Sequence, residues 1–196
     1  LVDATGRARV RAVVTLHPPD RARLEVPSPV EWPSELRALS VGDDVYGRAL
    51  FHGPAFQCVS SVAGVWEGGI AATLRRAPAP NVWQPGSGVD AWSVDPLVVD
   101  GIFQAMILWC REFVGAPSLP SRIARFRAFG TLPAEEVRIV ATVRRRRGGN
   151  VLSDVDVLGP GGELLARFDG YTCTASASLE AAFATGRGTA RPASPA

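Results

Sequence analysis

Asp95 to Cys110 reads DPLVVDGIFQAMILWC, and this stretch decides the fold. Asp95 is a good helix N-cap, because its carboxylate can accept hydrogen bonds from the first free backbone N–H groups. Pro96 fits the first helical position, where a missing N–H costs nothing. Nearly every residue that follows is apolar. We therefore predict a helix over residues 96–113 that is covered on nearly all sides.

Two polar residues interrupt the apolar run between Pro96 and Cys110. Asp100 and Gln104 are four residues apart, so they lie on one helix face, one turn above the other. A carboxylate in apolar surroundings is costly unless it is paired or used. We hypothesise that the pair belongs to a functional site. The alternative is that Asp100 only hydrogen-bonds to a neighbouring loop.

Composition and charge limit the class of protein. The 196 residues are 46% hydrophobic and 20% charged, which is typical of one globular domain with a sizeable core. A net charge of +2 does not favour a nucleic-acid partner, and no apolar run is long enough to span a membrane. The first residues are no signal peptide. The three cysteines, read as reduced thiols, lead us to expect a cytoplasmic protein. The chain begins without Met and in mid-pattern, which indicates a piece of something longer.

The cysteines give no sign of a disulfide framework or a metal site. Cys58, Cys110 and Cys173 are widely spaced and form no CxxC pattern, so a zinc site is not expected. We predict that all three are reduced, buried thiols.

Alternating apolar and polar residues predict strands on both sides of the helix. An early strand is expected over 7–16, followed by a Pro-rich segment over 17–35 and a short helix over 34–39. The other predicted strands span residues 57–67, 69–74, 123–130, 136–145, 151–158 and 163–173. Arg/Gly-rich and Gly/Pro-rich turns at 144–150 and 159–162 join the last three strands.

These elements favour one fold class. A helix that is apolar nearly all round is best covered by a curved antiparallel sheet, which gives an α+β hotdog fold. An all-parallel sheet is disfavoured, because only one long helix is available for crossovers. We expect the end of a preceding hotdog or a linker over 1–31, the hotdog domain over 32–174, and a flexible linker or tail over 175–196.

Two motifs carry a resemblance to a known family. The first motif is Tyr46 and, five residues later, the run Phe51-His52-Gly53-Pro54-Ala55-Phe56-Gln57. The second motif is the predicted helix with Asp100 and Gln104. This order resembles the dehydratase domain of polyketide synthases and of related fatty-acid and polyunsaturated-fatty-acid synthases. Leu119-Pro120-Ser121-Arg122-Ile123 and Asp169-Gly170-Tyr171-Thr172 fit the same pattern. The resemblance covers about residues 32–173.

The resemblance implies a fold, a reaction and roles for individual residues. Members of that family are double hotdogs, with a catalytic His in an HxxxGxxxxP motif of the N-terminal half and an Asp on the central helix of the C-terminal half. This chain would then be the C-terminal hotdog, with Asp100 as general acid and Gln104 supporting it. The residues implied to bind the substrate are Tyr46, His52, Gly53, Pro54 and Phe56.

The implied reaction removes water from a 3-hydroxyacyl thioester and leaves an enoyl thioester. A base takes a proton from C2 and an acid protonates the departing C3 hydroxyl, while backbone N–H groups of the Gly-Pro turn or the helix start could polarise the thioester carbonyl. No cofactor is implied beyond the phosphopantetheine that carries the substrate. The implied partners are an acyl carrier protein, neighbouring synthase domains and a second copy in a homodimer.

The chain departs from the family pattern at three places. His52 stands where the family usually has Tyr, and Asp95 stands where it usually has His. HxxxGxxxxP is absent, since Pro18-Pro19-Asp20-Arg21 follows His17. Residues 7–16 resemble the last strand of an N-terminal hotdog, so we expect that the half with the catalytic His lies upstream or has been lost. We interpret His52 as part of the tunnel wall rather than as a replacement base, and His17 as an exposed linker residue.

Several other features leave alternatives open. Trp83, Trp92 and Trp109 could line an acyl channel or only pack in the core. Residues 144–147, four consecutive arginines, form a solvated hairpin tip or dock an acidic carrier protein. Two rival functions also remain: a catalytically inactive hotdog kept for dimerisation or for the architecture of a synthase, and a thioester hydrolase or product-shaping domain on the same fold.

Overall fold

The computed structural model describes residues 12–13, 26–29, 31–86, 88–133 and 135–188. His17 and nearly all of the strand predicted over 7–16 lie outside these residues. The helices are α1 (Val45–Arg48), η1 (Pro54–Phe56), α2 (Pro80–Trp83), α3 (Pro96–Phe113), η2 (Ala177–Leu179) and α4 (Glu180–Gly188). The strands are β1 (Val59–Trp66), β2 (Gly69–Arg75), β3 (Ser118–Ala128), β4 (Glu136–Arg147), β5 (Asn150–Leu158) and β6 (Leu164–Ala175).

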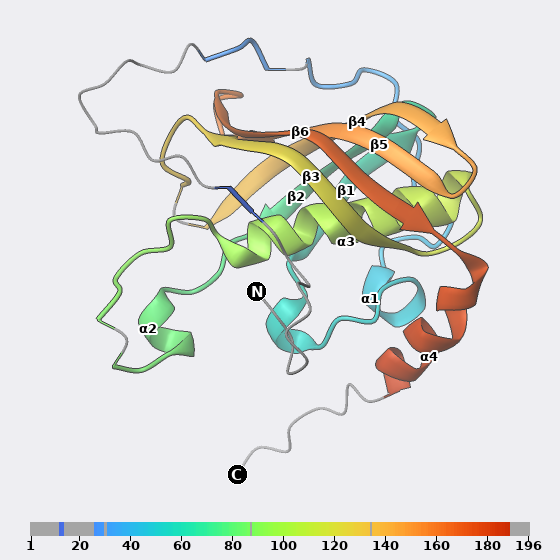
Figure 1. Cartoon of the computed structure of the whole chain (residues 1–196), viewed down its shortest axis with the longest axis horizontal. Helices are drawn as coiled ribbons and strands as arrows, with labels where there is room; N and C mark the ends of the chain where they lie inside the picture. The colour runs from blue at the N-terminus through green and yellow to red at the C-terminus, as the bar shows by residue number, and fades with distance from the viewer. Residues whose placement is uncertain (1–11, 14–25, 30, 87, 134, 189–196) are drawn as a thin grey trace.

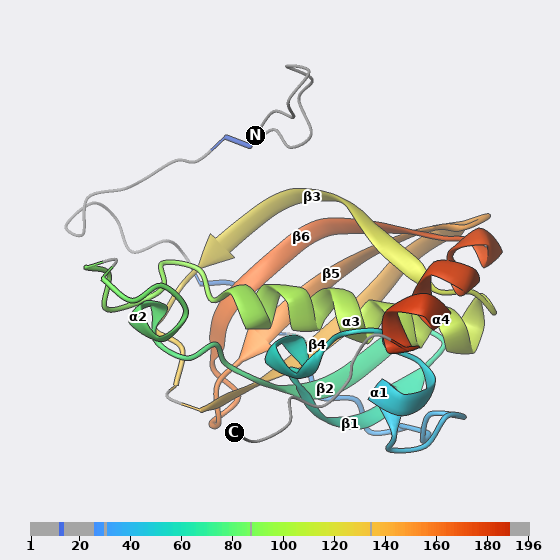
Figure 2. The ribbon, with the colours of Figure 1, turned by 90° about the horizontal axis from the view of Figure 1, so that it is seen from below.

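The six strands form one sheet in the order β1-β2-β4-β5-β6-β3, and each neighbouring pair is antiparallel. The sheet curves around α3, which lies along its concave face (Figures 1 and 2). This arrangement confirms the predicted α+β hotdog. The long connection from β2 through α2 leads into the N-terminal end of α3 (Figure 2).

Helix α3 is held tightly against β2. A Cβ atom added at Gly101 would lie 2.8 Å from Leu74 Cδ1 and 3.1 Å from Cys58 Sγ. A side chain at this position would have to push Leu74 and Cys58 aside, so glycine favours this close approach of helix and sheet. Trp109, two turns further along, is buried and donates a hydrogen bond from Nε1 to the carbonyl of Trp66 at 3.0 Å. Packing thus accounts for Trp109 without an acyl channel.

Three segments differ from the predictions. Residues 34–39 form no helix, because the backbone N–H and C=O of Arg37 pair with Val65 at 3.1 and 2.8 Å. Strand β3 begins at Ser118 rather than at Ile123, since its pairing with β6 extends as far as Ala175. In the segment predicted as a flexible tail from residue 175, the structure places η2 and α4.

Helix α4 packs back onto the domain through one buried aromatic side chain. The Phe183 ring meets the Phe51 ring edge-on, with 4.3 Å between their centroids. Arg111 of α3 pairs with Glu180 at 3.0 Å and donates from Nε to the Ala49 carbonyl at 3.0 Å. These contacts fix α4 beside the loop that follows α1.

Within the described residues, no helix combines the length and apolar character needed to cross a membrane. Cys58, Cys110 and Cys173 are all free and buried. The Sγ atoms of Cys110 and Cys173 lie 3.8 Å apart, between α3 and β6.

Candidate active site

The start of α3 forms as its sequence predicts. Asp95 caps the helix, and its Oδ1 accepts hydrogen bonds from the N–H groups of Leu97 and Val98, both at 3.0 Å. Its Oδ2 pairs with Nε of Arg76 at 3.1 Å. The first N–H groups of the helix are therefore already used, so the helix start is not available to polarise a thioester carbonyl.

Asp100 and Gln104 meet one turn apart, as expected from their spacing. Gln104 Nε2 donates to Asp100 Oδ2 and to the Phe56 carbonyl, both at 2.7 Å. Gln104 Oε1 accepts from the Tyr46 hydroxyl at 2.7 Å, and that hydroxyl accepts from the Val59 N–H at 2.7 Å. Gln104 is fully buried, so these bonds fix the orientation of its amide and present an N–H to the carboxylate of Asp100.

Tyr46 is held in its protonated form in this chain of hydrogen bonds. Burial raises the pKa of Tyr46 well above its usual value of 10.0, although the hydrogen bond from Val59 opposes the shift. The phenol is therefore a permanent donor to Gln104 at any physiological pH. Tyr46, Phe56, Asp100 and Gln104 thus form one hydrogen-bonded group, and all four are residues that the sequence analysis assigned to the site.

The Gly-Pro turn is fixed from behind by an arginine of β2. Gly53 is the N-cap of η1, and Pro54 occupies its first position. Arg75 donates from Nη2 to the Pro54 carbonyl at 3.1 Å and from Nε to the Gln57 carbonyl at 2.6 Å. A Cβ atom at Gly53 would meet nothing within 4 Å, so the turn leaves open space beside Gly53.

His52 lies directly beside Asp100. Its Nε2 is 3.6 Å from Asp100 Oδ2, and the His52 side chain is 11% exposed against 28% for Asp100. The imidazole stacks on Phe51 with 4.2 Å between ring centroids. Burial lowers the pKa of His52 below its usual 6.5, and the charge of Asp100 only partly opposes this shift. His52 is therefore neutral near pH 7.

The proximity of His52 to Asp100 is the feature that sequence reasoning missed. The two residues lie far apart in the chain, on a loop and on a helix. The only signal was an imidazole at a position where the family usually has Tyr, directly before Gly53 and Pro54.

An aromatic group borders the open side of the site. Phe56 lies 5.8 Å from Trp83, and Trp83 lies 5.7 Å from Trp92, measured between ring centroids. Trp92 and Val99 also line a cavity of about 250 Å³ at the N-terminal end of α3. Neither Asp100 nor His52 lines that cavity, so it adjoins the site without containing the reactive groups.

Among the described residues, no group of three or more His, Cys, Asp or Glu side chains is placed to hold a metal ion. The arrangement instead combines a carboxylate, an imidazole and a fixed amide. Carboxylates and imidazoles are groups that transfer protons.

This hotdog fold, with an acid on its central helix, agrees with the comparisons to known proteins. A family model described as the polyketide synthase dehydratase N-terminal domain matches residues 24–182. The chain belongs to this polyketide synthase dehydratase family. The description names an N-terminal domain, whereas the Asp100 motif predicts the C-terminal hotdog, so the C-terminal assignment stays a prediction.

One relative supports this family, and solved structures support the fold. The chain is 31% identical over 145 residues to one component of the polyunsaturated fatty acid synthase of Thraustochytrium sp. (strain ATCC 26185 / S-3), covering 71% of this chain and 5% of that protein. A crystallisation variant of the GphF dehydratase matches with a TM-score of 0.57 at 15% identity, covering 74% of this chain and 52% of that one. The dehydratase domain of PpsC from Mycobacterium tuberculosis matches with a TM-score of 0.50 at 23% identity, covering 64% and 44%.

The chain therefore spans about half the length of these solved dehydratases and a small part of the Thraustochytrium synthase protein. The structural likenesses establish the hotdog fold.

Proposed function

We propose that this domain removes water from 3-hydroxyacyl thioesters carried on the phosphopantetheine of an acyl carrier protein. It would act in the cytoplasm as the C-terminal hotdog of a dehydratase within a type I polyketide or fatty-acid synthase. The carrier protein and the neighbouring synthase domains are part of the proposal. The observation that carries it is the carboxylate of Asp100, which stands on the central helix with one oxygen oriented by Gln104.

Asp100 is the general acid in this proposal. Gln104 donates a hydrogen bond to Asp100 Oδ2. No side chain of the described residues donates to Oδ1. That oxygen can therefore carry the proton that the C3 hydroxyl needs to leave as water. A positioned acid of this kind contributes roughly 10²–10⁴ to the rate. Because the start of α3 is capped by Asp95, the Gly53-Pro54 turn remains the candidate for contact with the thioester carbonyl.

The substrate would enter along the aromatic side. Phe56 is exposed beside Trp83, and large rigid rings of this kind contact an acyl chain or a pantetheine arm at low entropic cost. Tyr46 acts through Gln104 rather than on the substrate, since its hydroxyl is already engaged on both sides.

The test is dehydration of 3-hydroxyacyl-pantetheine and 3-hydroxyacyl-carrier-protein thioesters, with enoyl product and free acid measured by mass spectrometry. We expect enoyl product and a loss of roughly 10²–10⁴-fold in rate for Asp100→Asn. Asp43→Asn is the matched control, because Asp43 is an exposed aspartate remote from α3 in sequence. An unchanged rate for Asp100→Asn would refute the role of Asp100, and free acid in place of enoyl product would indicate a hydrolase.

One observation favours a second candidate, a hotdog kept for assembly. Strand β3 is the end strand of the sheet, and most of its residues are exposed, including Leu119 and Ile123. A long exposed edge is a template for pairing with another strand. A chain that dimerises in sedimentation experiments but dehydrates no substrate, alone or within its synthase, would support this second candidate.

A further inference from the structure

His52 and Asp100 present two reactive atoms to the same space. Nδ1 of His52 is buried and has no hydrogen-bond partner among the described residues, so it is shielded from a substrate. Nε2 is the nitrogen that faces Asp100 Oδ2 at 3.6 Å. This distance is too long for a good hydrogen bond. Each group is therefore close to the other without being bound to it.

The imidazole is supported by its own loop and by α4. Phe51 stacks on one face of the ring, and Phe183 of α4 packs on Phe51 in turn. Gln57 Nε2 donates to the His52 carbonyl at 3.2 Å, while Arg75 holds the carbonyl of Gln57. Such support is what a catalytic group needs to keep a productive geometry.

We infer that His52 is the catalytic base of this domain, so that one hotdog carries both halves of the acid–base pair. This inference rests on the proposed dehydration. It differs from the arrangement in which the base comes from a second hotdog, and it gives His52 contact with the substrate's C2 proton rather than a place in the tunnel wall.

The proton transfers balance within the pair. Neutral His52 takes the C2 proton on Nε2, the C2–H electrons form the C2=C3 double bond, and the C3–O bond breaks as Asp100 gives its proton to the departing hydroxyl. Water and the enoyl thioester leave behind an imidazolium and a carboxylate. One transfer from Nε2 to the carboxylate, across the present 3.6 Å gap, restores the starting state without an outside acid or base.

The geometry also constrains the stereochemistry. C2 and C3 are bonded neighbours, and the two catalytic side chains approach within 3.6 Å of each other on one side of the site. With both groups on one side of the substrate, the proton and the hydroxyl would leave in a syn elimination. Burial keeps the His52 ring neutral near pH 7 because it lowers the pKa, and a base requires the neutral state.

Two reactions can test the role of the base, His52, separately from the role of the acid, Asp100. The first is dehydration of a 3-hydroxyacyl-pantetheine thioester. The second is exchange of the C2 hydrogens of a saturated acyl-pantetheine thioester with deuterium from D₂O, which needs a base but no leaving group. We expect Asp100→Asn to lose dehydration and keep exchange, while His52→Phe loses both, each by roughly 10²–10⁴-fold.

Two further variants keep the test decisive. His52→Tyr restores the residue usual in the family and fills similar space, so loss of both reactions in a folded His52→Tyr protein separates chemistry from packing. His17→Gln removes the other imidazole of the chain, and we expect it to retain both reactions. Circular dichroism of each variant checks that the fold is intact.

The outcomes distinguish this inference from the proposed function. If His52→Phe and His52→Tyr dehydrate as fast as the wild-type chain, His52 is not the base, although the domain is a dehydratase. If the wild-type chain catalyses neither reaction alone, the inference also fails, because a complete pair would act without a second hotdog. The proposed function is then decided separately, by Asp100→Asn in the intact synthase.

Discussion

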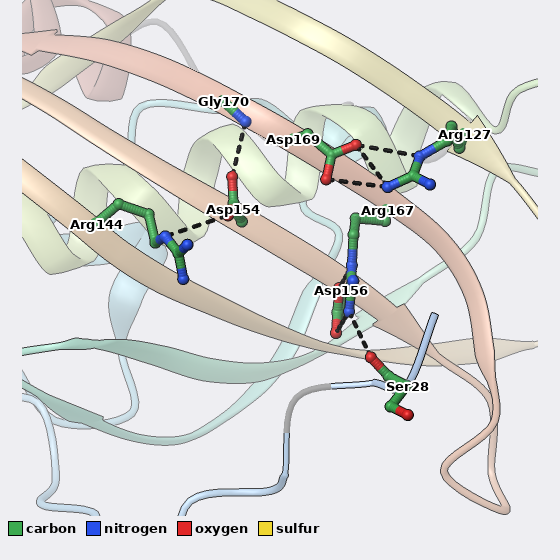
Figure 3. A network of polar contacts seen from close by, with 8 residues as sticks. All are labelled: Ser28, Arg127, Arg144, Asp154, Asp156, Arg167, Asp169 and Gly170. Carbon is green, nitrogen blue, oxygen red and sulfur yellow. Dashed lines mark hydrogen bonds and ion pairs between the residues drawn. The ribbon is translucent and has the colours of Figure 1, made fainter. Parts of the chain in front are cut away.

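The aspartates on the two sides of the sheet have opposite surroundings. On the face turned away from α3, aspartates pair with arginines: Asp156 with Arg167 at 2.5 Å and Asp169 with Arg127 at 2.9 Å (Figure 3). Asp154 pairs with an arginine and also accepts from the Gly170 N–H at 2.8 Å (Figure 3). Asp100, on the other side, faces an amide N–H and a neutral imidazole.

This difference separates acids that hold the fold together from an acid able to react. A carboxylate with a full-charge partner and several donors is bound in its ionised form and has no oxygen to spare. The hydrogen bond to Asp156 raises the pKa of Arg167 above its usual value, so Arg167 stays charged at every physiological pH. Asp100 pairs with no arginine of the described residues and keeps Oδ1 open, as a proton donor requires.

The largest expected effect on stability comes from the outer face. Asp156→Ala removes the partner of Arg167, whose side chain is only 18% exposed. The largely buried guanidinium then keeps the Ser28 carbonyl as an acceptor but loses its directly paired carboxylate, so we expect the free energy of unfolding to fall by about 3 kcal/mol. Urea denaturation measures this loss.

Arg144→Ala is the matched control for that prediction. Arg144 pairs with Asp154 at 3.4 Å but is largely exposed, so its removal costs about 1 kcal/mol or less. Dehydration by the folded fraction is expected to be unchanged in both variants. If Asp156→Ala were as stable as wild type but dehydrated the substrate more slowly, Asp156 would serve the reaction and not the stability of the fold.

The sequence predicted the parts of the site that depend on local signals. Asp95 as a cap, Pro96 at the first helical position and the one-turn spacing of Asp100 and Gln104 follow from rules of a single helix. The contact between His52 and Asp100 depends on how a loop far away in the chain packs against α3. Local patterns carry no information about such contacts.

Helix α4 illustrates the same limit. Its residues are rich in Ala and Gly, and Gly-rich composition is typical of linkers. One buried aromatic side chain, Phe183 against Phe51, packs the helix onto the domain. Tertiary packing therefore decides the structure of this segment, and its composition does not.

Gln104→Leu is expected to lower both the stability and the rate. In contrast, Asp156→Ala is expected to lower the stability alone and Asp100→Asn the rate alone. The change leaves the Phe56 carbonyl and the Tyr46 hydroxyl short of a partner in a partly buried place, which costs about 1–3 kcal/mol. It also frees the carboxylate of Asp100 to move, and misplacement of a reacting group can lower kcat roughly 100-fold.

Denaturation and steady-state kinetics measure the two losses for Gln104→Leu. Gln84→Leu, a change at an exposed glutamine, is the control and is expected to alter neither. A wild-type kcat in Gln104→Leu would mean that Asp100 needs no orienting partner. The hydrogen bonds around Asp100 would then not explain why it reacts and the arginine-paired aspartates do not.

The smallest effect is expected at a second carboxylate on α3 itself. Glu112 accepts from the Ser40 hydroxyl at 2.6 Å and pairs with Arg37. Burial alone would raise the pKa of Glu112, but these hydrogen bonds outweigh it and hold the pKa below the usual 4.5. A lowered folded-state pKa stabilises the protein above the unfolded pKa, and this contribution is lost as the pH falls through the folded value.

Wild type should therefore be more stable than Glu112→Gln by about 1 kcal/mol at pH 7. The difference should shrink as the pH falls below 4.5, the usual Glu value. Thermal unfolding of both proteins across this range measures it, with Glu35→Gln as the control at an exposed glutamate. A gap that widens in acid would mean that Glu112 is bound in its neutral form. The pairing with Arg37 would then no longer distinguish Glu112 from Asp100, which pairs with no arginine of the described residues.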